Sequence, residues 1–380
     1  MTYFSSHDHS NEAPAPDPLT HDPQGPVLLV GGYGTVGAEL ARLVAAEHPV
    51  LLTGRAPERA AALVRELGGA PHAEVRRWDL ADPAPFPAAV RAVVGVVNDP
   101  DARVLRAAAA AGVPYADVTR WTARLQRAAT VAALLRPTAP VLLSSAWMGG
   151  VVSLVAAALA ERLGGADRVE TAVRWDLADR AGADSVEFMD RLGLDYEVVR
   201  EGHRRTVTPL SGTGTVRIGD HPTRVARIDT PEQFTLPLTL GTRTATTRIG
   251  FSSALSTRAL LAAKHTGFFR WGRGERWQSA RRALLYSPGE GGTALLRVDV
   301  THGGQGLAAL VEDRAGQAHL TAVGALLALR RALGTDGSAP APAGLCFPEQ
   351  APDPTEVLPA LAALGVTVDI RSATGLDAAA

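Results

Sequence analysis

The hydrophobic pattern of the chain changes in three steps. Residues 1–25 hold few apolar positions among many Pro, Asp, His and Ser residues, which predicts an unstructured tail. Between residues 26 and 150, short continuous apolar runs alternate with helical periodicity, as in parallel strands joined by helices. Between residues 151 and 334, the strands alternate polar and apolar positions, which is typical of an antiparallel sheet.

The region 26–150 predicts a Rossmann domain, an α/β fold built on a doubly wound parallel sheet. Strands are expected at 27–30, 49–53, 75–78, 92–97, 115–118 and 141–143. Helices are expected at 35–47, 57–67, 102–111 and 121–135. Ligands of such sheets bind beyond the carboxyl ends of the strands, so the residues that follow each strand are the first candidates for a site.

The region 151–334 predicts a second, α+β domain on a mostly antiparallel sheet, which would bind substrate and support dimerisation. Strands are expected at 171–177, 215–218, 223–228, 242–249 and 293–300, with helices at 151–163, 185–192, 252–264 and 318–333. Residues 335–343 read as a linker, and residues 344–380 are expected to pack back on the core. Aromatic residues of the second domain permit a homodimer, which is our prediction.

A glycine-rich turn follows the first strand. Gly32, Gly34 and Gly37 stand in the G-x-G-x-x-G spacing of a dinucleotide-binding turn, between a strand and a helix. The first glycine permits a sharp turn, the second leaves room for a pyrophosphate, and the third lets the helix pack close to the strand. We therefore assign a dinucleotide to Gly32, Tyr33, Gly34, Thr35, Val36 and Gly37. The alternative is a structural turn that binds no nucleotide.

The end of the second strand distinguishes NADP from NAD. An acid at this position would bind the ribose 2′-hydroxyl and repel a phosphate, but the chain has Thr53, Gly54 and Arg55 here. A guanidinium binds phosphate through charge-assisted hydrogen bonds, so NADP(H) is the predicted cofactor. The alternative for Arg55 is a solvated residue at the start of the next helix.

Polar residues follow several of the other strands. They are Asp79, where related folds contact adenine, then Asn98, Asp99, Asp117, Thr119, Arg120, Ser144 and Ser145, with Trp147 close behind. Such residues also start helices by accepting hydrogen bonds from backbone N–H groups. That capping role is the favoured interpretation for Asp99, which precedes Pro100 and a helical pattern.

Composition excludes several classes of protein. A formal net charge of −1 gives no electrostatic case for nucleic acid. No apolar run reaches the roughly 18 residues that a membrane span needs, and the first residues lack a signal-peptide pattern, so a cytoplasmic location is expected. The single cysteine, Cys346, excludes an internal disulfide, and no cluster has metal-ligand spacing, so we predict no metal.

The order of motifs along residues 27–152 resembles the cofactor domain of saccharopine dehydrogenase-like reductases. These motifs are G-G-Y-G-T-V-G, T-G-R, V-V-N-D-P and A-G-V-P-Y-A-D-V-T, and P-A-G-L-C-F-P-E-Q near the C-terminus is also similar. The resemblance implies that a nicotinamide cofactor reduces a C=N bond or another polarised double bond of a small metabolite. It further implies that Gly32, Gly34, Gly37, Thr53 and Arg55 bind NADP(H), with Asn98 and Asp117 near the nicotinamide.

The resemblance leaves the substrate and the proton donor open, because the second domain carries no motif that can be transferred. No tyrosine has a lysine four residues later, so the dyad of short-chain dehydrogenases is absent. We name His302, Lys264 and Asp117 as candidate catalytic residues, and Trp147, Arg174 and His203 as candidate substrate contacts. His302 precedes two glycines and fits a turn equally well, whereas Lys264 is the sole lysine and would titrate if buried.

A segment rich in arginine and tryptophan, R-W-G-R-G-E-R-W at 270–277, has three interpretations. It would clamp an anionic substrate, receive an acidic carrier protein, or form a solvated basic loop, which is the favoured interpretation. We therefore predict an NADPH-dependent oxidoreductase in amino-acid-derived or secondary metabolism. The alternative is a non-catalytic NADP-binding sensor or a partner of a carrier protein.

Overall fold

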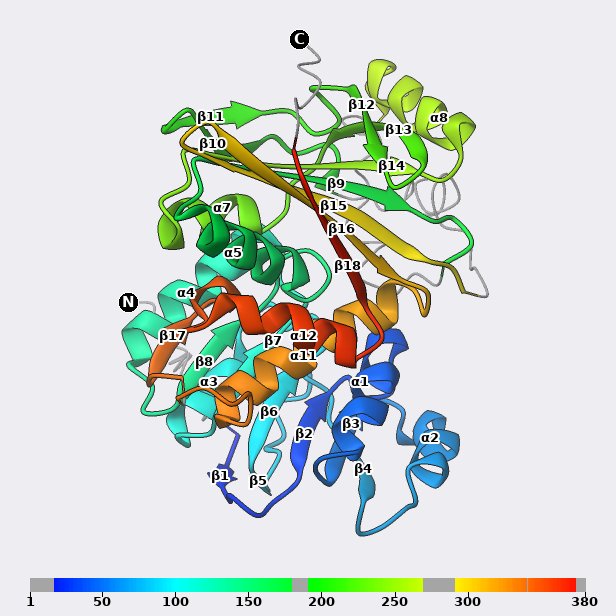
Figure 1. Ribbon diagram of the computed structural model, residues 1–380. Coiled ribbons are helices and arrows are strands. Elements are labelled where there is room, and N and C mark those ends of the chain that lie inside the picture. The colour runs from blue at the N-terminus through cyan, green and yellow to red at the C-terminus, as the bar shows by residue number, and fades with distance from the viewer. Residues whose placement is uncertain (1–16, 180–190, 269–290, 340, 374–380) are drawn as a thin grey trace, which may run out of the picture.

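The fold consists of two large sheets with helices packed on and between them (Figure 1). The computed structural model describes residues 17–179, 191–268, 291–339 and 341–373. The predicted helix at 185–192 and the segment 270–277 lie mostly or wholly outside these ranges.

The first sheet is a seven-stranded, wholly parallel sheet. Its order is β17 (Gly344–Cys346), β8 (Pro140–Leu143), β7 (Tyr115–Asp117), β6 (Ala92–Gly95), β2 (Val27–Val30), β3 (Val50–Gly54) and β4 (Ala73–Arg77). The strand order reverses direction between β2 and β6, which is the point at which doubly wound folds bind their ligands. The predicted Rossmann architecture is confirmed.

Helices cover both faces of this sheet because its strands are apolar on both sides. In β2, Val27 and Leu29 pack with α1 (Thr35–Ala45), while Leu28 and Val30 pack with α3 (Arg103–Ala110) and α4 (Thr122–Leu135). The helix predicted at 57–67 divides into a short 3₁₀ turn, η1 (Pro57–Ala60), and α2 (Ala61–Glu66). A small parallel pair, β1 (Leu19–His21) with β5 (Ala88–Val90), lies beside the domain.

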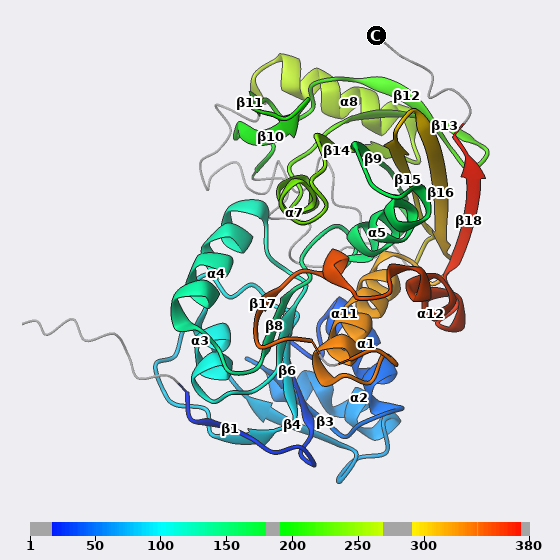
Figure 2. The same cartoon turned by 60° about the vertical axis from the view of Figure 1, so that its left-hand side comes forward.

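The second sheet also has seven strands and is mostly antiparallel, as predicted. Its order is β12 (Gly214–Ile218), β13 (His221–Arg227), β14 (Thr244–Phe251), β9 (Arg168–Trp175), β15 (Ala294–His302), β16 (Gln305–Asp313) and β18 (Thr367–Ser372). Only β14 and β9 pair in parallel within this sheet. A separate hairpin joins β10 (Tyr196–Arg200) to β11 (His203–Val207). Figure 2 shows α5 (Val151–Leu163) and α7 (Glu232–Thr239) on the side of the sheet that faces the first domain.

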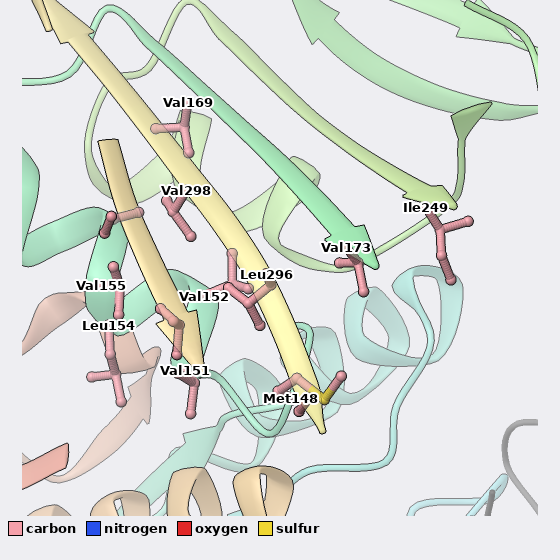
Figure 3. Packing of buried hydrophobic residues seen from close by; sticks show 14 of the residues in the cluster. Met148, Val151, Val152, Leu154, Val155, Val169, Val173, Ile249, Leu296 and Val298 are labelled. Atoms are coloured by element: carbon pink, nitrogen blue, oxygen red, sulfur yellow. The ribbon is translucent and has the colours of Figure 1, made fainter. Parts of the chain in front are cut away.

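The buried core of the second domain lies between its sheet and α5. Val169 and Val173 lie on one face of β9 and point, with Leu296 of β15, toward Val152 and Val155 of α5 (Figure 3). This strand alternation is the pattern from which the antiparallel sheet was predicted. A further helix, α8 (Ala254–His265), joins this core through Leu260 and Leu261.

The helix predicted at 318–333 forms as α11 (Gln317–Leu333), but it does not belong to the second domain alone. Leu320 and Val323 pack in the core of the second domain, whereas Leu326 and Leu329 pack with α1 in the core of the first. Because α11 carries small and apolar residues on more than one side, it packs in both cores. The predicted boundary at residue 334 therefore does not separate two packing units.

Regular elements extend close to both ends of the described chain. Asp17 forms a salt bridge with Arg103 at 2.7 Å and β1 follows directly, so the predicted unstructured tail of 1–25 is wrong for residues 17–25. At the other end, β17 extends the first sheet, while η3 (Pro348–Gln350), η4 (Pro354–Glu356), α12 (Val357–Ala363) and β18 lead to the second. Within the described ranges, no helix is long and apolar enough to span a membrane.

Candidate functional site

The glycine turn between β2 and α1 leaves room that side chains would otherwise fill. A Cβ on Gly37 would lie 2.1 Å from the carbonyl oxygen of Gly31, so the helix approaches the strand only because Gly37 has none. A Cβ on Gly34 would meet just one atom, the Gly31 oxygen at 3.4 Å, so the space in front of Gly34 is open. The sharp turn itself falls on Gly31, whose φ is +86°, and not on Gly32 as predicted.

The start of α1 presents unpaired backbone donors to this open space. Gly34 is the N-cap residue in an extended conformation, and no side chain caps the helix. The first intrahelical bond runs from the Ala38 N–H to the Gly34 carbonyl, so the amides before it are available to an anion. Available amides and the positive end of the helix dipole together form the usual binding site for a pyrophosphate.

The end of β3 carries the residues expected to bind the adenosine ribose. Thr53 is buried and donates to the Leu29 carbonyl at 3.3 Å, so it supports the strands and does not face a ligand. The Tyr33 ring lies over Gly54, where a Cβ would meet the Tyr33 hydroxyl at 2.3 Å. The same hydroxyl accepts a hydrogen bond from the Ala56 N–H at 2.9 Å. Arg55 is exposed beside this group, so its guanidinium is accessible to a phosphate.

A cavity of about 160 Å³ lies between the two domains. Its walls come from the start of α1, from the loops after β7 and β8, from the end of β9 and from the start of α11. The lining residues are Thr35, Val36, Val118, Thr119, Arg120, Trp121, Ser145, Ala146, Trp147, Met148, Gly149, Trp175, Pro231, Gln317, Ala318 and Thr321. The residues of the glycine turn and the strand ends that meet in this cavity, among those named from the sequence, are Thr35, Val36, Thr119, Arg120, Ser145 and Trp147.

The loop after β8 is held in an unusual backbone conformation. Met148, Gly149 and Gly150 all have positive φ, at +54°, +63° and +95°. A Cβ on Gly149 would lie 2.4 Å from the Thr321 carbonyl oxygen, so this loop packs directly against α11. A methionine in this region is strained by about 1–3 kcal/mol, and such residues are held by their surroundings at functional sites. The loop thereby fixes Trp147, whose backbone N–H donates to the buried Glu232 carboxylate at 3.1 Å.

Asp117 lies behind the cavity wall in a buried hydrogen-bond network. One carboxylate oxygen accepts from Arg120 Nε at 2.5 Å and from the Tyr115 hydroxyl at 3.0 Å, while the other accepts from Ser145 at 2.5 Å. Arg120 also donates to the Asp99 carbonyl at 3.2 Å and lies 3.6 Å from the Asp99 carboxylate. Asp117 is 1% exposed and is not among the lining residues, so its predicted catalytic role is corrected to a positioning role.

Three tryptophans and one glutamine also belong to the wall. Trp147 and Trp175 meet edge to face, with ring centroids 6.1 Å apart, and Trp121 stands at the start of α4. Gln317 is 9% exposed, and its side-chain amide nitrogen has no hydrogen-bond partner. An unpaired amide in a cavity wall is a donor that a ligand would satisfy.

Two predicted residues of the β9 and β15 strands lie away from the cavity. His302 pairs with Gln305 at the β15–β16 turn, beside the start of β9, whereas Trp175 lines the cavity from the other end of β9. The seven residue-to-residue steps from Arg168 to Trp175 of β9 span roughly 23 Å. His302 therefore lies beside a turn and outside this cavity, and a catalytic role for it finds no support in this geometry. Arg174 points to the opposite face of the sheet from Trp175, because side chains alternate along a strand.

Lys264 and His203 are also placed elsewhere. Lys264 lies in the last turn of α8, where partial burial lowers its pKa, but it is not among the cavity residues. His203 is exposed at the start of β11, on the separate hairpin. Both residues were chosen for their chemical type and not from a motif, so the sequence carried no information about their position relative to the cavity.

Of the remaining strand-end residues, Asp99 has a structural role, whereas the ligand contacts predicted for Asp79 and Asn98 are untested. Asp99 accepts from the N–H groups of Arg103 at 2.8 Å and Val104 at 3.0 Å, so it caps α3 as favoured. Burial raises the pKa of Asp99, while Arg120 opposes that rise. Asp79 accepts from the Ala81 N–H at 3.2 Å within a turn, and its contact with adenine stays a prediction, as does that of Asn98 with nicotinamide.

The sequence reasoning missed Gly31, Trp121, Trp175, Gln317 and Thr321. The only available signal for Trp175 was its place near the end of a strand in a chain with 6 tryptophans. Gln317 gave no signal, because its position follows from a helix that returns to the first domain after about 170 residues in the second.

The comparisons with known proteins agree with this architecture. No protein-family model and no curated protein matches the sequence. Apo saccharopine dehydrogenase (L-Glu forming) from Saccharomyces cerevisiae has a similar structure, with a TM-score of 0.63 and 12% identity over 92% of this chain and 99% of that chain. Pen from Bacillus thuringiensis overlaps 41% of this chain and 60% of its own at a TM-score of 0.26 and 15% identity. MalC reductase/Diels-Alderase from Malbranchea aurantiaca overlaps 31% of this chain and 72% of its own, at a TM-score of 0.23 and 16% identity.

The two partial overlaps have scores too low to establish a shared fold. The first match extends over nearly the whole of both chains, including both sheets. The chain has the fold of saccharopine dehydrogenase.

Proposed function

We propose that the protein is an NADP(H)-dependent oxidoreductase of the saccharopine dehydrogenase-like family that reduces a C=N bond of a small metabolite. One observation carries the proposal. Thr35 and Val36, at the start of the helix that follows the glycine turn, line the same cavity as Ser145, Trp147 and Trp175. A dinucleotide held by the turn would therefore have its reactive end beside a space bounded by the second domain.

The residues present fit such a dinucleotide. Gly34 leaves its space open, the first amides of α1 are available, and Arg55 is exposed at the end of β3. NADPH, when bound, supplies a hydride. The protein must then bind the acceptor, exclude water, and supply or accept one proton. Trp147, Val36 and Met148 supply apolar wall for this purpose.

Ser145 favours a protonated imine over a conjugated carbonyl compound. Its hydroxyl hydrogen is directed to Asp117 at 2.5 Å, so its oxygen faces the cavity as an acceptor. An iminium N–H is a donor that such an oxygen would bind. An enone instead needs a donor at its developing oxyanion, and Ser145 cannot be that donor because its hydrogen is already committed to Asp117.

The proposal is tested by titrating the protein with NADPH and by following NADPH oxidation at 340 nm, a standard wavelength, with a panel of cyclic imines. We expect NADPH to bind and at least one imine to be reduced. Failure to bind NADPH or NADH would refute the proposal. Binding without oxidation of NADPH by any imine or enone would favour the alternative of a non-catalytic sensor.

Arg55→Glu should change cofactor preference. The substitution removes a phosphate donor and places an acid that repels the 2′-phosphate, so NADPH affinity should fall about 10- to 100-fold while NADH affinity changes by less than about threefold. Fluorescence titration with both cofactors measures this. Arg65→Glu on α2 is the matched control, because Arg65 is also exposed and its substitution makes the same change in charge. Equal losses for both cofactors would contradict the role of Arg55.

A further inference from the structure

We propose that Tyr33 sets the cofactor preference of this chain in two ways. Its hydroxyl donates to the 2′-phosphate of NADP(H), and its ring excludes the acid that NAD-binding proteins place at the end of the second strand. The inference rests on the proposed function for the binding of a dinucleotide, and it adds the residue that distinguishes the two nicotinamide cofactors. The supporting observations are the position of the Tyr33 ring over Gly54, its hydrogen bond with Ala56, and the exposure of Arg55.

The Tyr33 side chain occupies the space that a side chain at position 54 would need. A Cβ on Gly54 would lie 2.3 Å from the Tyr33 hydroxyl oxygen, 2.5 Å from Cζ and 3.0 Å from Cε1. The ring is half-buried and packs against the core of the first domain, which holds it in this place. Any residue larger than glycine at position 54 must therefore displace the ring.

This position is the one at which an acid would favour NAD. Gly54 ends β3, the strand after which a carboxylate binds the ribose 2′-hydroxyl in NAD-binding proteins. Such a carboxylate and the Tyr33 ring exclude each other. Residues 53–56 contain no acid, Thr53 is buried with its hydroxyl bonded to the Leu29 carbonyl, and Arg55 carries the opposite charge. The end of β3 thus presents a guanidinium and a phenol hydroxyl.

The hydroxyl of Tyr33 is a donor whose hydrogen is available. Its oxygen accepts a hydrogen bond from the Ala56 N–H at 2.9 Å, and no acceptor within the described ranges takes its hydrogen. A phenol hydroxyl can accept and donate at once, so the bond with Ala56 orients the oxygen and leaves the hydrogen for a ligand. A hydrogen bond to a phosphate oxygen is charge-assisted and about twice as strong as the neutral bond that the ribose hydroxyl of NADH offers.

Tyr33→Phe tests the hydroxyl, by fluorescence titration with NADPH and NADH in the absence of any imine. NADPH affinity should fall about 5- to 10-fold and NADH affinity by less than about twofold, because only NADPH carries the charged acceptor. Tyr196→Phe is the matched control, since the Tyr196 hydroxyl lies on the separate hairpin and has no hydrogen-bond partner among the described residues. Equal losses for both cofactors, or no loss for NADPH, would overturn the role of the hydroxyl.

Gly54→Ala tests the contact between the ring and the strand. The φ of Gly54 is not positive, so the backbone allows alanine, and the new methyl group displaces the Tyr33 hydroxyl. NADPH affinity should fall at least as far as in Tyr33→Phe, while Tm should shift by less than about 4 °C, because only the end of one side chain moves. The two losses should not add in the double variant, since both substitutions remove the same hydrogen bond. Additive losses would contradict the contact.

An acid at position 54 tests the exclusion directly. Gly54→Asp alone should raise NADH affinity by less than about twofold, because the Tyr33 ring stands where the carboxylate must go. Gly54→Asp combined with Tyr33→Ala frees that space, and NADH should then bind at least about fivefold more tightly than to Gly54→Asp alone. Equal NADH affinities in the two variants would show that the ring does not exclude the acid.

The outcomes separate this inference from the proposed function. NADPH binding that Tyr33→Phe leaves unchanged would refute the role of Tyr33, while reduction of an imine by the same protein would still support the reductase. A selective loss of NADPH affinity in Tyr33→Phe, in a protein that oxidises NADPH with no imine or enone, would support the role of Tyr33 and refute the reductase.

Discussion

Gly37→Ala is expected to destabilise the fold and to abolish cofactor binding. The new methyl group would lie 2.1 Å from the Gly31 oxygen and 2.9 Å from the Gly32 backbone, and neither atom can move without the strand. The helix α1 must then shift away from β2 and lose its contact with Leu29. We expect a loss of about 2 kcal/mol or more in the free energy of unfolding, measured with urea in the absence of cofactor.

Gly34→Ala is the control for this variant. Its φ of −72° and ψ of −179° are allowed for alanine, and the nearest atom lies 3.4 Å from the new Cβ. Stability should therefore change by less than about 0.5 kcal/mol, whereas NADPH affinity should fall at least about tenfold, because the methyl group fills the space proposed for the pyrophosphate. Unaltered NADPH affinity in Gly34→Ala would locate the pyrophosphate elsewhere.

Asp117→Ala is expected to be among the most destabilising single substitutions in the first domain. It would leave Arg120 as a buried charge whose principal partner has gone, with side-chain exposure of only 5%. Removing one partner of a buried ion pair costs about 3–5 kcal/mol. The measurement is the unfolding free energy, with Asp82→Ala as the control because Asp82 is an exposed acid of the same domain. Similar losses in both variants would contradict the network described for Asp117.

Asp117→Asn distinguishes the two roles of this residue. The amide keeps the shape and one acceptor oxygen, so the protein should fold and bind NADPH. Ser145 would then lose its charged acceptor and the fixed direction of its hydroxyl, and kcat should fall about 10- to 100-fold with little change in KM for NADPH. A kcat equal to that of the wild type would show that the Ser145 orientation does not matter for the reaction.

The first domain was predictable because its fold follows from local pattern. Continuous apolar runs such as the one at Val27, and the glycine spacing that ends at Gly37, specify a parallel strand, a turn and a helix within a few residues. The capping role of Asp99 was predictable for the same reason. Even there, the left-handed residue of the turn is Gly31, which lies just before the first glycine of the spacing and is identified only by its backbone conformation.

The cavity was not predictable because its residues meet only through tertiary packing. Trp175 and Gln317 are separated from the glycine turn by more than a hundred residues, and no local pattern relates them. Candidates chosen by residue type, such as His302 and Lys264, lie on elements that pack away from the first domain. Trp147 was found because it follows a strand of the parallel sheet, where the rule about strand ends applies.

The path of the chain between the sheets limits how this protein can be divided. The described chain passes from the first sheet to the second after β8, reaches the shared helix α11 after β16, and adds β17 to the first sheet and β18 to the second. A fragment ending near residue 150 would lack an edge strand of its sheet and the helix that covers Leu29 and Leu40. The first domain therefore cannot be exchanged between proteins of this fold by a single splice, and a folded chimera would need both Gly344–Cys346 and α11 from the same parent as the glycine turn.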